Sequence, residues 1–205
     1  MIGIVDYGVG NLFSLSSSLR ALGAETVVTG DPEKLLKADR ILLPGVGAFG
    51  DAAQKLRSRD LDQLLISQAG KGVPILGICL GMQLLFQKSY EYGEHPGLGL
   101  IPGSVTSMEG RIPGELKIPH IGWNQLVFPE EKQRSPLFRD LNQEDYVYFV
   151  HSYSAVDCDA YVSARTEYGA AITAAAEKDN VFGCQFHPEK SGPVGLKILK
   201  AFCEL

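Results

Sequence analysis

The chain has 205 residues, enough for one or two domains with a sizeable core. It carries 19 basic and 24 acidic side chains, and the resulting net charge of −5 argues against a nucleic-acid partner. No apolar run reaches the roughly 18 residues of a membrane span, and the first residues lack the basic segment of a signal peptide. The four cysteines form no CxxC pair, which disfavours disulfides and a metal site. We therefore expect a cytoplasmic protein, and no motif indicates a cofactor.

Strands and helices alternate along the first half of the chain. Apolar, β-branched runs predict strands at Ile2–Val5, Thr26–Thr29, Ile41–Leu43 and Pro74–Ile78. Apolar residues at helical spacing predict helices over 11–22, 51–71 and 80–88. A further helix is predicted to begin after Asp31, which would be its N-cap. Such alternation is typical of an α/β fold with a mostly parallel central sheet and helices on both faces.

The second half contains shorter extended runs separated by Pro, Gly and Asn. They predict antiparallel strands or extended loops added to the sheet at Val105–Met108, Gln125–Phe128, Tyr146–Val150, Tyr161–Thr166 and Ala170–Ala176. A buried-type strand at Val181–Phe186 and an amphipathic helix at Ser191–Phe202 follow. No linker, repeat or low-complexity tract interrupts the chain, so we expect one domain over residues 1–205.

The run Gly77-Ile78-Cys79-Leu80-Gly81 joins a predicted strand to a predicted helix. It has the G-x-nucleophile-x-G spacing of a nucleophile elbow, in which flanking glycines permit a tight turn. Cys79 would lie at a helix N-terminus, which favours a thiolate, and the Leu80 N–H would be free to stabilise an oxyanion. The alternative is an ordinary buried cysteine, the commoner fate of a lone Cys and our interpretation of Cys158, Cys184 and Cys203.

A candidate base follows the last predicted strand, in the run Phe186-His187-Pro188-Glu189. Pro188 restricts the His187 backbone to extended values, and Glu189 is close enough to accept a hydrogen bond from the imidazole. A capped loop with a surface glutamate is the alternative for this run alone. Together with the Cys79 elbow, it indicates a Cys–His–Glu set for acyl transfer.

A glycine-rich loop, Pro44 to Gly50, follows the third predicted strand. Such a loop can direct backbone N–H groups of Gly45, Val46 and Gly47 at a developing negative charge. It lacks the Lys-Ser/Thr pair of a phosphate-binding P-loop. Because glycines permit two backbone arrangements, we hypothesise that it rests with one N–H turned away until a partner binds.

Taken together, these three segments resemble the class I (triad-type) glutamine amidotransferases over almost the whole chain. The resemblance implies that Cys79 attacks the side-chain amide of L-glutamine, that His187 transfers protons, and that Glu189 orients His187. It further implies that Gln83 binds the substrate and that His151, Ser152 and Tyr153 line the glutamine pocket.

Within that family the chain is similar to glutaminase subunits that form a heterodimer with a (β/α)8-barrel cyclase of histidine biosynthesis and deliver ammonia to it. This similarity rests on the runs at 6–12, 44–50, 119–124, 148–153 and 188–191. It implies that the docking face comprises Asn11, Trp123, Tyr146, Tyr148 and Lys190. Trp123, the single Trp, lies in a Pro/Gly-rich segment where an exposed aromatic residue often marks an interface.

Three other functions remain open from the sequence. The chain could serve another amidotransferase, act as a stand-alone γ-glutamyl hydrolase, or be a regulatory subunit without activity. The intact Cys79, His187 and Glu189 argue against the last of these.

Overall fold

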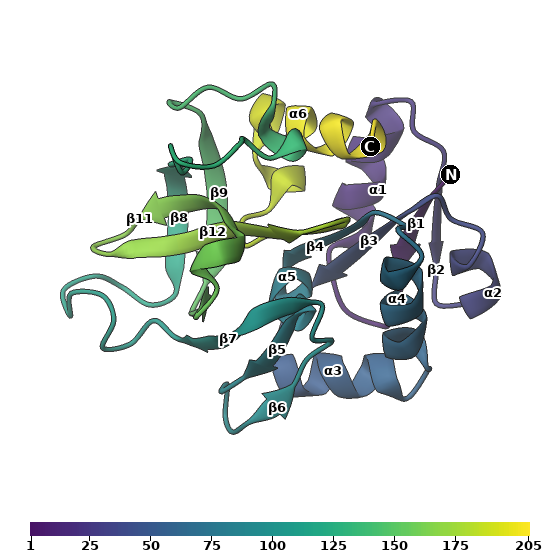
Figure 1. Ribbon diagram of the computed structural model, residues 1–205, viewed down its shortest axis with the longest axis horizontal. Coiled ribbons are helices and arrows are strands. Elements are labelled where there is room, and N and C mark those ends of the chain that lie inside the picture. The colour runs from purple at the N-terminus through teal and green to yellow at the C-terminus, as the bar shows by residue number, and fades with distance from the viewer.

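The computed structural model describes residues 1–205, and its central feature is a seven-stranded sheet in the order β11-β12-β13-β4-β3-β1-β2 (Figure 1). The strands from β13 to β2 are parallel, whereas β12 and β11 run antiparallel to their neighbours. The strand bounds are β1 Ile2–Val5, β2 Thr26–Thr29, β3 Arg40–Gly45, β4 Ile75–Cys79, β11 Val162–Glu167, β12 Ala171–Lys178 and β13 Val181–Cys184. The predicted α/β class and mostly parallel sheet are confirmed.

Helices cover both faces of this sheet, with α1 and α6 on one side and α3 and α4 on the other (Figure 1). Successive strand residues point to opposite faces, so Ile4 and Leu42 join one buried core while Val5 and Leu43 join the other. The helix bounds are α1 Leu12–Ala21, α2 Pro32–Leu35, α3 Phe49–Arg57, α4 Leu61–Gly70, α5 Leu80–Leu85 and α6 Gly192–Cys203. No helix combines the length and apolar character that crossing a membrane requires.

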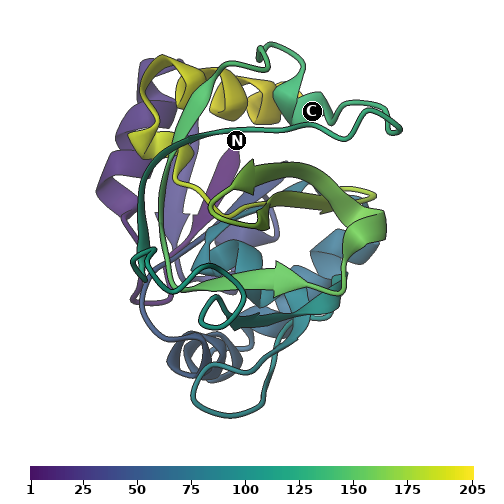
Figure 2. The same ribbon diagram turned by 90° about the vertical axis from the view of Figure 1, so that its left-hand side faces the viewer.

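Two smaller sheets extend the fold. A four-stranded sheet has the order β10-β7-β5-β6, and an antiparallel pair is formed by β8 and β9. The side of the molecule that carries β8, β9 and β11 faces the viewer in Figure 2. The bounds are β5 Phe86–Ser89, β6 His95–Pro96, β7 Ile101–Ser107, β8 His120–Gln125, β9 Tyr146–His151 and β10 Tyr153–Val156. Short 3-10 helices are η1 Pro136–Phe138, η2 Asp159–Tyr161 and η3 Pro188–Lys190.

Three predicted elements differ from the structure. The helix predicted over 51–71 is two helices, because Asp60 adopts a left-handed backbone with φ of 54° between them. The helix predicted over 80–88 ends at Leu85, and Phe86 instead begins a strand paired with β7. The strand predicted at 125–128 is displaced, since β8 ends at Gln125 and Val127 forms only an isolated bridge.

The parallel strands β3, β4 and β13 bring three segments of interest to one edge of the sheet. Gly45 at the end of β3 is paired with Cys79 at the end of β4, and Cys184 at the end of β13 is paired with Ile78. Carboxyl ends of adjacent parallel strands meet at the same edge, which is where α/β proteins bind ligands. The glycine-rich loop, the cysteine turn and the histidine segment therefore converge there.

Candidate active site

Cys79 occupies a strained turn between β4 and α5. Its backbone has φ of 55° and ψ of −113°, a conformation that residues other than glycine rarely adopt. A Cβ on Gly81 would lie 1.8 Å from the Leu43 carbonyl oxygen, and one on Gly77 would lie 2.6 Å from the Gly81 oxygen. Only glycine fits at either position. The turn thus has the geometry of the predicted nucleophile elbow.

The sulfur of Cys79 has two protein neighbours within hydrogen-bonding range. The Val150 carbonyl oxygen lies 3.8 Å from Sγ and can accept from the thiol. The Gln185 side-chain amide nitrogen lies 3.7 Å from Sγ and can donate to it. The carbonyl acceptor favours the protonated thiol and the N–H donor favours the thiolate, so the two contacts act in opposite directions on the sulfur.

His187 and Glu189 form a buried pair directly after β13. His187 Nδ1 lies 2.8 Å from Glu189 Oε1, and the two side chains are 2% and 3% exposed. The His187 backbone N–H donates to the Tyr148 carbonyl, and its carbonyl accepts from the Ser191 hydroxyl, so the segment is fixed on both sides. The ring therefore has one orientation, with Nδ1 toward the carboxylate and Nε2 left without a hydrogen-bond partner.

The pKa of His187 follows from this environment. Burial opposes the charged ring, but the interactions with Cys79 and Glu189 outweigh burial and raise its pKa to about 9. The imidazolium form is therefore favoured next to the sulfur, which is the partner that a thiolate nucleophile requires. The structure brings Cys79, His187 and Glu189 together, and their arrangement is suited to acyl transfer.

A pocket of about 370 Å³ opens above Cys79 and His187. Seven of the eight residues predicted to bind glutamine or stabilise its oxyanion line this pocket: Val46, Gly47, Leu80, Gln83, His151, Ser152 and Tyr153. Gly45 is not part of the lining, but at the end of β3 it is paired with Cys79. Glu91, Tyr92, Pro119 and Val150 complete the lining and were missed by the sequence reasoning.

The glycine-rich loop is held at both ends. At its start, the buried Tyr7 hydroxyl donates to the Pro44 carbonyl oxygen at 2.8 Å. At its end, the Phe49 backbone N–H donates to Glu91 Oε2 at 2.5 Å, so Glu91 caps α3 from 42 residues away. Gly47 between them has φ of 96°. Neither Tyr7 nor Glu91 could be identified from local sequence, because both contacts are made across the fold.

Behind the pocket, His120 and His151 form a hydrogen-bonded pair. His120 Nδ1 lies 3.1 Å from His151 Nε2, and His151 Nδ1 lies 2.9 Å from the Tyr153 carbonyl oxygen. On the far side, His120 Nε2 lies 2.8 Å from Asn124 Oδ1. Burial is the main cause of a lowered pKa in both rings, and it brings the pKa of His151 to about 4.

The predicted docking residues lie on neighbouring segments of one side of the molecule. Trp123 on β8 and Tyr146 on β9 are 52% and 48% exposed. The ring of Trp123 packs against Tyr148 with centroids 5.8 Å apart, and the Lys190 ammonium lies 5.9 Å from the Tyr148 ring. Asn11 caps α1 through its side-chain oxygen, which accepts from the Ser14 N–H. Their role in docking stays a prediction.

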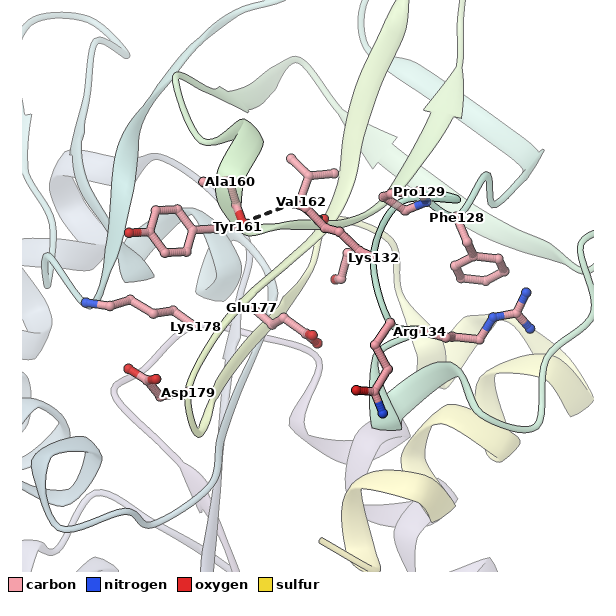
Figure 3. A pocket seen from close by; sticks show the side chains of 12 residues that line it. Phe128, Pro129, Lys132, Arg134, Ala160, Tyr161, Val162, Glu177, Lys178 and Asp179 are labelled. Carbon is pink, nitrogen blue, oxygen red and sulfur yellow. Dashed lines mark hydrogen bonds between the residues drawn. The ribbon is translucent and has the colours of Figure 1, made fainter.

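A second pocket, of about 290 Å³, lies between the segment 128–134 and the strands β11 and β12 (Figure 3). Glu177 extends toward its centre in this view, but no cysteine or histidine lines it. The Lys132 ammonium donates to the backbone carbonyls of Asp159, Ala160 and Val162, so its charge serves the fold. The structure contains no cluster of His, Cys, Asp and Glu that could hold a metal ion. The pocket at Cys79 is therefore the candidate active site.

Comparison with known proteins identifies the class. The model of the glutamine amidotransferase class-I family matches residues 3–204, and the chain belongs to this family. Its fold is similar to PurLQS from Thermotoga maritima, with a TM-score of 0.75 and 23% identity over 99% of this chain and 97% of that one. A second solved glutamine amidotransferase gives a TM-score of 0.74 at 16% identity, covering 100% and 99% of the two chains.

Similarity to particular members is much higher. The chain is 51% identical over 205 residues to the imidazole glycerol phosphate synthase subunit HisH of Carboxydothermus hydrogenoformans, covering 100% of both proteins. It is 50% identical over 204 residues to the same subunit of Sulfurimonas denitrificans, covering 98% of this chain and 97% of the relative. The HisH subunit of Methanothermobacter thermautotrophicus is 48% identical over 100% of this chain and 98% of its own length.

Proposed function

We propose that this chain is the glutaminase subunit of imidazole glycerol phosphate synthase and that it acts in histidine biosynthesis. The observation that carries the proposal is the convergence of Cys79, His187 and Glu189 at one sheet edge, in a chain similar over its full length to HisH subunits. The proposed reaction is hydrolysis of L-glutamine to glutamate and ammonia.

In this mechanism His187 takes the thiol proton and Cys79 Sγ attacks the amide carbon of glutamine. The tetrahedral oxyanion would be stabilised by the Leu80 N–H and by N–H groups of the loop containing Gly45, Val46 and Gly47. His187 then gives its proton to the leaving nitrogen, ammonia departs, and a glutamyl thioester remains. Water, deprotonated by His187, attacks the thioester, and glutamate leaves as Cys79 regains its proton. Glu189 holds the ring in position throughout.

The substrate would occupy the pocket lined by Gln83, His151, Ser152 and Tyr153. The Gln83 amide nitrogen already donates to the Tyr153 carbonyl and to Gln185 Oε1, so both of its protons are engaged. The oxygen of Gln83 is consequently the atom left for contact with glutamine.

The proposed partner is a (β/α)8-barrel cyclase, bound at Asn11, Trp123, Tyr146, Tyr148 and Lys190. Ammonia would pass from Cys79 to this cytoplasmic partner, which would use it to convert PRFAR to imidazole glycerol phosphate and AICAR. The exposed aromatic side chains of β8 and β9 support a docking role, because such residues dominate the centres of protein interfaces.

A Cys79→Ala variant tests the proposal. Glutamine-dependent synthesis by the heterodimer should fall by about 10³-fold or more, while synthesis from added ammonia should persist. Both rates are measured as imidazole glycerol phosphate formation with the purified cyclase and PRFAR. Cys203→Ala, on α6 outside the pocket, is the matched control and should keep both activities.

Two outcomes would contradict the proposal. Surviving glutamine-dependent synthesis in Cys79→Ala would exclude Cys79 as the nucleophile. Equal glutamate release from wild-type protein with and without the loaded cyclase would favour a stand-alone γ-glutamyl hydrolase.

A further inference from the structure

Gln185 lies between β13 and His187 and has no exposed surface. Its backbone N–H donates to the Ala174 carbonyl of β12, which fixes the main chain at this point. Its side chain reaches Cys79, and the amide nitrogen lies 3.7 Å from Sγ. No step of the mechanism above uses this amide, although it touches the reacting atom.

The orientation of the Gln185 amide is determined by its neighbours. A backbone carbonyl oxygen only accepts hydrogen bonds, so the Gln83 amide must present its nitrogen to the Tyr153 oxygen, 3.2 Å away. The same nitrogen donates to Gln185 at 2.9 Å, and Gln185 must therefore present its oxygen to Gln83. This leaves the NH₂ group of Gln185 facing the sulfur. The Tyr153 carbonyl therefore fixes the orientation of the Gln83 amide, and Gln83 in turn fixes which end of the Gln185 amide faces Cys79.

We propose that Gln185 is a further catalytic residue, whose side-chain N–H stabilises the Cys79 thiolate and whose orientation Gln83 maintains. This rests on the proposed function only in taking Cys79 as the nucleophile. An N–H donor favours an anionic acceptor over a neutral one, because charge-assisted hydrogen bonds are the stronger kind. The Val150 carbonyl at 3.8 Å acts in the opposite direction by accepting from the protonated thiol. If the Gln185 donor were lost, only the Val150 contact would remain of these two, and it favours the protonated thiol.

The test is the pH dependence of Cys79 alkylation by iodoacetamide in the purified full chain, followed at the Cys79 peptide by mass spectrometry. Gln185→Met keeps the side-chain length but removes the donor. We expect alkylation at pH 7 to slow about tenfold and the midpoint of the pH–rate profile to rise by about one pH unit. A variant that merely restricted access would scale the rate equally at every pH and leave the midpoint unchanged.

Gln185→Glu provides an isosteric second variant in case the first fails to fold. One carboxylate oxygen can still accept from Gln83, while the other replaces the donor at the sulfur, so the midpoint should rise at least as far. Gln83→Met frees the Gln185 amide to rotate and should give a midpoint between wild type and Gln185→Met. Gln68→Met, at another buried glutamine on α4, is the matched control and should match wild type.

A wild-type midpoint in folded Gln185→Met or Gln185→Glu would overturn the proposal. A wild-type midpoint in Gln83→Met would overturn the part that assigns orientation to Gln83. Neither result depends on glutamine turnover, so failure here is distinguishable from failure of Cys79→Ala to abolish glutamine-dependent synthesis.

Discussion

Two buried histidines border the same pocket, yet their pKa values are shifted in opposite directions. Burial disfavours the charged ring in both. The Nδ1 atom of His187 faces the Glu189 carboxylate at 2.8 Å, whereas that of His151 faces the uncharged Tyr153 carbonyl at 2.9 Å. The neighbouring rings of His120 and His187 lower the pKa of His151 further.

The comparison teaches that the partner of the ring, and not its depth, decides which histidine can carry a proton at neutral pH. His187 is suited to proton transfer because Cys79 and the Glu189 carboxylate stabilise its charge. His151 is also buried, but no charged partner offsets its burial, and it is suited to a neutral, structural role in the pocket wall. Burial alone would not have distinguished them.

Among tests of this comparison, the largest effect is expected from Glu189→Gln, which gives His187 a neutral partner like that of His151. We expect the pKa of His187 to fall and glutamine hydrolysis by the heterodimer to fall by about 10³-fold, since the ring loses its charge stabilisation and fixed tautomer. NMR titration of His187 and glutamate release measure the two changes. Activity within tenfold of wild type would mean that His187 does not need the Glu189 carboxylate to transfer protons.

A second test follows the pH dependence of unfolding. His151 has a folded pKa of about 4 against a usual 6.5, so its stabilising contribution is complete above pH 6.5 and is lost as the pH falls toward 4. His187 has a folded pKa of about 9, so its contribution is complete below pH 6.5 and is lost as the pH rises toward 9. The curve of stability against pH thus has an acid limb, from His151, and an alkaline limb, from His187. Each limb amounts to about 3 kcal/mol in the free energy of unfolding.

Urea unfolding from pH 4 to 9 measures both limbs in one series. We expect His151→Asn to flatten only the acid limb and His187→Asn only the alkaline limb. Each variant serves as the control for the other, and a variant that flattened both limbs equally would show that the two histidines do not titrate independently.

The smallest effect is expected from His120→Phe. Phenylalanine can keep the stacking on Tyr168, whose ring centroid lies 3.9 Å from that of His120, but it loses the contacts with His151 and Asn124. We expect a loss of about 1–2 kcal/mol in stability and a rise of less than about one unit in the pKa of His151. NMR titration checks the second value, and a rise that approached the pKa of His187 would make His120, not burial, the main cause of the shift.

The sequence predicted best those features that neighbouring residues determine. The alternation of strands and helices, the elbow at Cys79 and the pair His187 and Glu189 are all encoded within short runs, and the structure brings these runs to one edge. The left-handed turn at Asp60 was not predicted, because buried Leu56 and Leu61 continue the helical pattern on both sides of it.

Features that depend on distant contacts could not be predicted. Glu91 is an unremarkable acidic residue in the sequence, and its capping of α3 appears only when the turn between β5 and β6 meets the start of that helix. Gln185 stands two residues before His187, yet its role rests on contacts with Gln83 and Cys79 that lie about a hundred residues away. Phe86 ends α5 because β7 offers it a strand partner.

The Tyr153 carbonyl oxygen lies between the amides that contact Cys79 and the pair of His151 and His120. It accepts from Gln83 on one side and from His151 on the other, and an oxygen that only accepts has no proton to pass on. The thiol and the histidine pair therefore exchange no proton along this chain of contacts. In the proposed mechanism the proton that Cys79 releases therefore passes to His187 and from there to the leaving nitrogen, and not through the Tyr153 carbonyl.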